Sequence, residues 1–98
     1  MEKTLIDIVS KTYITSKRKV LEKDSGIASL ANRYKEHYRV NVEFIEYVVS
    51  CLNDDDRLII ENEVLKGKKG AWYYEYMSAP TYYRHRKKAY TNFLQSLI

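Results

Sequence analysis

The chain of 98 residues has few of the residues that cross-link or reverse a small protein. Its one cysteine, Cys51, cannot form an internal disulfide, and neither histidine has the neighbours of a zinc site. Three glycines and one proline provide few turns, whereas a sheet of short strands needs many. These absences predict an all-α fold without structural disulfides or metal.

Long apolar runs are also absent, so no segment is expected to span or enter a membrane. Together with the single cysteine, this predicts a soluble, cytoplasmic protein. The length suits one small domain, residues 1–98. Lys and Arg number 17 against 13 Asp and Glu, and the resulting charge of +4 favours polyanionic partners such as nucleic acid.

Apolar residues at helical spacing predict three helices in an N-terminal part, residues 1–53. The first helix, over about 3–23, carries one stripe made of Leu5, Ile8, Val9, Thr12, Tyr13 and Val20. Residues 24–26 should end it, and the apolar positions of a second helix are Ile27, Leu30, Ala31, Tyr34 and Tyr38. Asn41 is expected to cap a third helix, with Val40 packed on Ile45. The buried face of that helix should hold Phe44, Val48, Val49 and Leu52.

The C-terminal part, residues 54–98, contains the clearest helix and loop signals. A helix over about 55–65 should begin with Asp54, Asp55 and Asp56 at its positive end and should pack on two sides. The glycine-bounded segment 66–70 is a loop. Residues 71–77 are predicted as a short helix, although their aromatic side chains favour strands, because there is no partner strand. The sequence therefore predicts five or six helices in all.

The last helix, residues 79–97, has the clearest start signal. Ser78 is a favourable N-cap, and Pro80 suits the first turn. One face holds Tyr82, Ala89, Phe93 and Leu97, with Tyr90 and Leu94 beside them. The opposite face holds Pro80, Arg84, Lys87 and Thr91, flanked by Thr81, Tyr83 and Lys88. A basic outward face suits a recognition helix in the DNA major groove, but charge alone would also fit an ordinary solvated surface.

An apolar helix, a loop, a short helix, a tight connection and a capped basic helix follow each other in helix-turn-helix order. The segment from Leu52 to Leu97 resembles the helix-turn-helix of sigma-factor region 4 and of phage ArpU-family transcriptional regulators. The residues that carry this resemblance are Leu52, Leu58, Ser78-Ala79-Pro80-Thr81-Tyr82-Tyr83-Arg84, Lys88-Ala89, Phe93 and Leu97. The chain is also similar to small mollicute proteins that end in a Tyr-Tyr-Arg helix.

The resemblance implies that residues after the capping serine enter the major groove. By position, the DNA-binding residues would be Ala79, Pro80, Thr81, Tyr83, Arg84, Lys87 and Lys88. The families usually have a Glu-Ile-Ala-type scaffold helix and a turn glycine, where this chain has Trp72-Tyr73-Tyr74 and Tyr76. The first helix of the motif is therefore expected to be shorter or differently angled.

No catalytic constellation is visible, so we expect a protein that is not an enzyme and holds no cofactor. Asp54–Asp56 lack the alternating ligands of a calcium loop, His37 and His85 should lie at or near the surface, and Cys51 should be a small core residue. The N-terminal cations could extend a phosphate-binding surface but suit a solvated face better; they are Lys11, Lys17, Arg18, Lys19 and Lys23. Four tyrosines, if exposed, could form a partner-binding patch, though core packing is expected for most; they are Tyr13, Tyr34, Tyr38 and Tyr47.

The sequence thus predicts a transcription regulator or accessory factor that binds double-stranded DNA through residues 79–97. The main alternative is a helical protein-interaction module that docks on RNA polymerase or another regulator without binding DNA. RNA binding through the basic, aromatic helix is a third reading. Helix-turn-helix proteins commonly bind paired half-sites as dimers, so a homodimer is compatible with the first reading.

Overall fold

A computed structural model describes the backbone of residues 2–21 and 28–98, and side chains for residues 2–21 and 36–98. The helices are α1 (Glu2–Leu21), α2 (Ala28–Ser50), α3 (Asp54–Ile60) and α4 (Ala79–Ser96). A π-helical turn, η1 (Glu61–Leu65), continues α3, and η2 (Trp72–Glu75) is a single 3-10 turn. No strand occurs in these ranges, which confirms the all-α prediction. The described residues form four α-helices, however, and not five or six.

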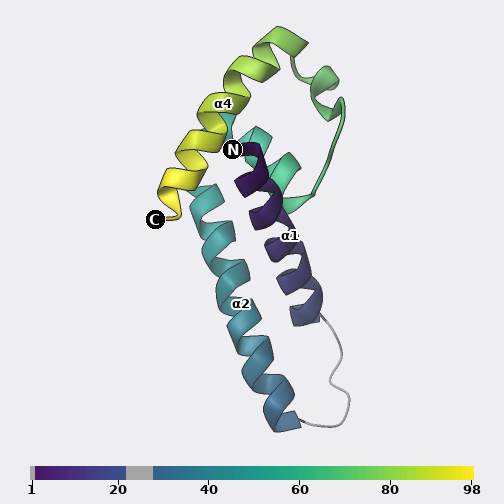
Figure 1. The fold of residues 1–98 in the computed structure, drawn as a ribbon, viewed down its shortest axis with the longest axis vertical. Coiled ribbons are helices and arrows are strands. Elements are labelled where there is room, and N and C mark those ends of the chain that lie inside the picture. Colours follow the sequence, from purple (N-terminus) through teal and green to yellow (C-terminus); the bar gives the residue numbers. More distant parts are fainter. Residues whose placement is uncertain (1, 22–27) are drawn as a thin grey trace.

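Helices α1 and α2 lie side by side as a long antiparallel hairpin, and α4 crosses the end of the hairpin at which α1 begins and α2 ends (Figure 1). The short unit α3–η1 packs against α1 through η1 and against α4 through α3. This confirms that the segment predicted over 55–65 is packed on two sides. The N-terminal half of α4 extends past the hairpin, with η2 beside it (Figure 1).

The predicted break between the second and third helices is wrong, because α2 runs without interruption from Ala28 to Ser50. No glycine or proline occurs in this range, and Val42, Ile45 and Val49 form one buried face. Asn41 is therefore an interior helical residue and not an N-cap. Val40 is 56% exposed and does not pack as predicted. The expected break at 24–26 and the positions Ile27, Leu30, Ala31 and Tyr34 lie outside the described backbone or side chains.

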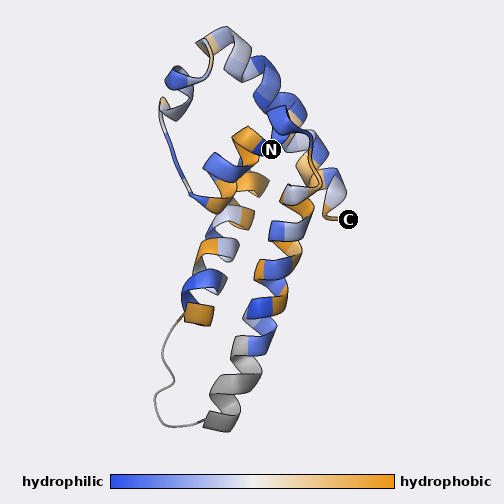
Figure 2. Ribbon diagram, turned by 180° about the vertical axis from the view of Figure 1, so that it is seen from behind, coloured by the Kyte–Doolittle hydropathy of each residue, from blue (hydrophilic) through white to orange (hydrophobic). Residues whose placement is uncertain are grey.

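The core joins all the helices. Its fully buried side chains are Ile6, Val49, Ile59, Ile60, Val64, Ala89 and Phe93. Figure 2 shows hydrophobic residues where the helices face one another, and hydrophilic residues along the loop before η2 and the middle of α4. The core is therefore continuous from the hairpin to α4, whereas the surface of α4 is polar.

Several apolar residues predicted as buried are exposed. Leu5 and Ile8 of α1 are 45% and 55% exposed, and Phe44 of α2 is 48% exposed. Cys51, predicted as a small core residue, is exposed as well. The apolar stripes of α1 and α2 are wider than the contact between the two helices, so one edge of each stripe stays in solvent.

The start of α3 agrees with the predicted role of the acidic run. Asn53 is the N-cap, and its side chain accepts a hydrogen bond from the Asp56 N–H at 2.9 Å. Asp54, Asp55 and Asp56 occupy the first turn, where the helix dipole favours negative charge. The Asp56 carboxylate also accepts a hydrogen bond of 2.7 Å from the Asn92 amide of α4, so the first turn of α3 is held on α4.

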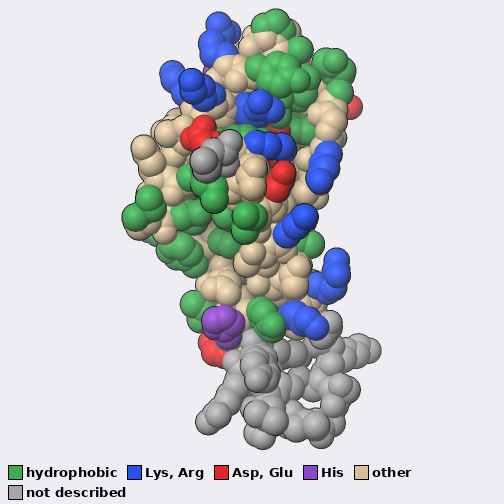
Figure 3. Space-filling view, viewed as in Figure 1, with side chains coloured by type: hydrophobic (Ala, Val, Ile, Leu, Met, Phe, Trp, Pro, Cys, Tyr) green, Lys and Arg blue, Asp and Glu red, His purple; other side chains and the backbone are tan. Residues whose placement is uncertain are grey.

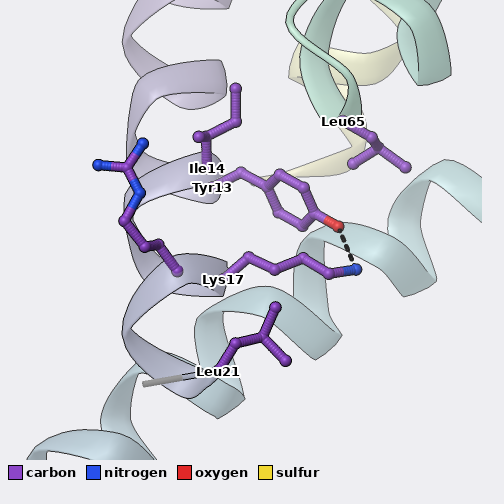
Figure 4. A pocket seen from close by; sticks show the side chains of 6 residues that line it. Tyr13, Ile14, Lys17, Leu21 and Leu65 are labelled. Carbon is purple, nitrogen blue, oxygen red and sulfur yellow. Dashed lines mark hydrogen bonds between the residues drawn. The ribbon is translucent and has the colours of Figure 1, made fainter. Parts of the chain in front are cut away.

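A polar group joins the two helices of the hairpin. The Tyr13 hydroxyl donates to the Glu46 carboxylate, and the Lys17 ammonium lies 2.9 Å from the same oxygen. Lys17 also donates to the Tyr13 hydroxyl at 3.2 Å, as Figure 4 shows at the edge of a pocket lined by Ile14, Leu21 and Leu65. These bonds hold the pKa of Glu46 below its ordinary value, and the bond from Tyr13 has a larger effect than the bond from Lys17.

Glu46→Gln should therefore lower the free energy of unfolding at about pH 7, by less than about 1 kcal/mol because the group is partly exposed to solvent. A carboxyl group whose pKa is lower in the folded protein stabilises the fold at pH values above its ordinary pKa. That stabilisation is lost as the pH falls through the pKa of the folded state. Urea unfolding of both proteins at several pH values measures the effect. The difference between them should shrink in acid; an equal difference at all pH values would contradict the assignment.

Candidate nucleic-acid interface

The start of α4 follows the predicted signals with one difference in hydrogen bonding. Ser78 is the N-cap in extended conformation, and Pro80 occupies the first turn. The Ser78 carbonyl accepts the first helical bond from the Tyr82 N–H at 2.9 Å, but its hydroxyl donates to the Thr81 hydroxyl at 3.0 Å and caps no backbone N–H. The helix thus begins where the sequence indicates.

The inward face of α4 is also as predicted. Tyr82, Ala89, Tyr90 and Phe93 are buried, and Leu94 and Leu97 pack against the core at its edge. These residues bring α4 onto α3. At the level of Thr91, the helix is also tied to α1, because the Thr91 hydroxyl donates to the Glu2 carboxylate at 2.6 Å. The orientation of α4 is therefore fixed along its C-terminal half by packing on both sides.

A buried carboxylate fastens the inward face of α4. Glu63 of η1 is 7% exposed and accepts hydrogen bonds from the hydroxyls of Tyr82 and Tyr90, and from the Trp72 indole N–H at 3.1 Å. Burial, and then the neighbouring carboxylate, raises the pKa of both phenols well above the ordinary value, so both remain protonated donors at neutral pH. One side chain thus connects η1, η2 and α4.

Aromatic rings hold the Tyr-rich segment before α4 against that helix. The ring of Tyr73 stacks on that of Tyr82 with 3.8 Å between centroids, and Trp72 meets Tyr82 edge-on at 5.9 Å. The guanidinium of Arg86 lies 4.9 Å from the ring centroid of Tyr83 and 5.7 Å from that of Tyr90. The predicted short helix at 71–77 is thus a single 3-10 turn at 72–75, held on α4 by ring contacts.

The outward face of α4 carries three exposed cations, Arg84, Lys87 and Lys88. None of them forms an ion pair with a described residue, so their charges face solvent. Pro80 is exposed and Tyr83 is 53% exposed on the same outer surface. The remaining predicted DNA-binding residues, Ala79 and Thr81, are half-buried at the start of the helix.

The structure adds lysines from the loop before η2, which sequence reasoning treated only as a connection. Lys68 and Lys69 line a pocket of about 340 Å³ together with Tyr83 and Arg86 of α4. Lys3 of α1 lies on the same pocket, and its ammonium is 3.5 Å from the Asp7 carboxylate. The run of lysines between two glycines was the available signal, but its position beside α4 depends on the tertiary fold.

Gly67 determines the path of this loop beside α1. Its φ of +64° lies in the left-handed region, and a Cβ at this position would be 2.8 Å from the Ile14 Cδ1 atom. A side chain would therefore meet both backbone strain and a close contact. The glycine allows the loop to pass closely over α1 and carry Lys68 and Lys69 toward α4.

The other candidates from the sequence form no site in the described part of the chain. His37 is exposed and meets Tyr38 edge-on, with 5.9 Å between ring centroids, and His85 is half-buried. Within residues 2–21 and 36–98, no three His, Cys, Asp or Glu side chains are grouped so as to hold a metal ion. No helix in the described ranges combines the length and apolar character that crossing a membrane requires.

Comparison with protein-family models, curated proteins and solved structures gave no match to this chain. The resemblance to sigma-factor region 4 and ArpU-family regulators therefore stays a prediction.

Proposed function

We propose that the protein is a DNA-binding transcription regulator or accessory factor that places the N-terminal half of α4 in the major groove of duplex DNA. The observation that carries this proposal is the outward face of α4, on which Arg84, Lys87 and Lys88 are exposed and form no ion pair with a described residue. Arg and Lys bind phosphates and the acceptor atoms of guanine, and an α-helix fits the major groove.

The arrangement around α4 supports a helix-turn-helix. The turn η2 precedes α4 by three residues, Tyr76, Met77 and Ser78, which is the length expected of the connecting turn. The unit α3–η1 packs against α4, and its Glu63 accepts a hydrogen bond from Trp72 of η2, so this unit would take the place of the supporting helix. The first helix of the motif would be η2, reduced to one turn and stabilised by its contacts with Tyr82 and Glu63.

The loop lysines extend this surface. Because Lys68 and Lys69 share a pocket with Tyr83 and Arg86, they lie close enough to α4 to meet the phosphate backbone beside the groove that α4 occupies. Base-reading contacts would then come from Arg84 and Tyr83, while Lys87, Lys88 and the loop lysines would contact phosphates.

A salt series on random-sequence duplex DNA tests the proposal. The logarithm of the binding constant should fall linearly with the logarithm of salt concentration. Arg84→Ala and Lys87→Ala should weaken binding, and Lys87→Ala should reduce the slope by about 1, because one phosphate contact is lost. Glu61 is a half-buried residue of η1. Glu61→Ala is the control and should leave the dependence of binding on salt concentration unchanged.

Absence of duplex binding at low salt would overturn the proposal. The second candidate, a helical module that docks on RNA polymerase or another regulator, is favoured by one observation, the exposed apolar side chains of α1 and α2. Measurable affinity for single-stranded RNA that exceeds the affinity for duplex DNA would favour RNA binding instead.

A further inference from the structure

One face of the α1–α2 hairpin exposes apolar side chains from both helices. The exposed fractions are 45–55% for Leu5 and Ile8 of α1, and 48–68% for Val40, Phe44 and Tyr47 of α2. Figure 3 shows hydrophobic side chains gathered over this face, from the C-terminal end of α4 toward the lower part of the hairpin. We call these five residues the hairpin face. Contiguous exposed apolar surface of this kind marks an interaction site more often than a single exposed residue does.

The apolar surfaces of the two helices are continuous with each other. Ile8 and Thr12 of α1 line a groove of about 260 Å³ together with Phe44 and Ile45 of α2, and Leu97, which follows α4, also lines it. A partner that covers this groove would therefore contact both helices at once, as one helical hairpin does when it packs on another.

The charges at the two edges of the hairpin face have opposite signs. On α1, Val9 lines the groove on one side of Ile8. Lys11 lies on the other side of Ile8 around the helix, and so it is at the outer edge of the hairpin face. On α2, Ile45 lines the groove on one side of Phe44. Glu43 lies on the other side of Phe44 around the helix, at the opposite outer edge of the hairpin face. Lys11 and Glu43 are both exposed, and neither pairs with a described residue. Figure 3 shows several cations along the α1 edge.

We propose that the hairpin face binds a second copy of this chain. A two-fold axis parallel to the hairpin would lay α1 on α2 of the partner, antiparallel, and form a four-helix bundle of two hairpins. Each Lys11 then lies near the partner's Glu43, at both edges of the interface. A two-fold axis across the hairpin would instead bring like charges together, Lys11 near Lys11 and Glu43 near Glu43, which is unfavourable.

The preferred axis also determines where the two α4 helices lie. In each chain, α4 lies at one end of the hairpin (Figure 1). Because the proposed axis is parallel to the hairpin, the two α4 helices would lie at the same end of the dimer. The charges and apolar side chains of the hairpin face belong to α1 and α2, so the association does not depend on whether α4 binds DNA.

Sedimentation equilibrium of the purified chain, without DNA, tests the association. The wild type should form dimers at micromolar concentrations, and Phe44→Glu should raise the dimer dissociation constant at least about tenfold, because a charge would be buried in the interface. Phe44 is half-exposed, so circular dichroism should show an unchanged helix content. Tyr74→Glu, at a residue of η2 that is 67% exposed, is the matched control and should leave the dissociation constant unchanged. A wild type that remains monomeric, or a dimer that Phe44→Glu does not weaken, would overturn the proposal.

A charge exchange tests the orientation of the two copies. Lys11→Glu and Glu43→Lys should each weaken the dimer, and the double variant should recover the wild-type dissociation constant, because the pair is restored with its signs reversed. In the alternative arrangement, the double variant would still place like charges together and would not recover. Failure to recover would therefore overturn the proposed axis, and unchanged dissociation constants in both single variants would do the same.

Discussion

Glu63→Ala should reduce the free energy of unfolding by about 3 to 5 kcal/mol, the largest effect that we expect from a single polar residue. The substitution removes the acceptor for two buried phenols, Tyr82 and Tyr90, and for the Trp72 indole. A buried donor without an acceptor costs about 1 to 3 kcal/mol, and the half-buried indole can turn to water while the two phenols cannot.

Urea unfolding followed by circular dichroism measures this loss. Glu61→Ala is a matched control, because Glu61 belongs to the same helical turn, has no hydrogen bond from its side chain to a described residue and should cost less than about 1 kcal/mol. Fluorescence of the single tryptophan, Trp72, should also change in the Glu63 variant, since η2 loses its link to η1. Equal unfolding midpoints for the two variants would show that the buried carboxylate does not hold these elements together.

Arg84→Glu should lower the affinity for duplex DNA by about 100-fold at low salt. A bidentate arginine contact with guanine contributes about 1 to 3 kcal/mol, and the new carboxylate would in addition repel the phosphates. Arg84 is exposed and makes no ion pair with a described residue, so the thermal stability should stay close to that of the wild type.

Arg39→Glu makes the same change in net charge at another place. Arg39 is exposed near the middle of α2, roughly 16 Å along the helix from its C-terminal end, and its ion pair with Glu36 is exposed and weak. Fluorescence anisotropy with a labelled duplex measures both variants at the same salt concentration. If Arg39→Glu weakens binding as much as Arg84→Glu does, the effect is due to net charge, and the assignment of the interface to α4 is wrong.

Local patterns predicted the secondary structure well where start and stop signals were strong. Ser78 and Pro80 located the beginning of α4, and the acidic run Asp54–Asp56 located the beginning of α3. The division of α2 at Asn41 was wrong because asparagine is also tolerated inside a helix, and the buried residues on both sides, Val42 and Ile45, form one continuous face.

The role of Glu63 could not be predicted from the sequence. Its three donors lie 9, 19 and 27 residues away along the chain, and a glutamate in a helix is usually an exposed residue. The same limit applies to Lys68 and Lys69, whose position beside α4 depends on how the loop crosses α1 at Gly67.

The sequence by itself determined the helical class and the inward face of α4, because helical spacing and capping act over a few residues. Thr91, predicted on the outward face, is instead half-buried and bonded to Glu2 of α1. Tertiary structure decided which apolar residues are covered, and it left Ile8 and Phe44 exposed on the hairpin face while it buried Glu63. The reason is physical, because the spacing of apolar residues defines which side of a helix is apolar. How much of that side becomes buried depends on the elements that pack on it.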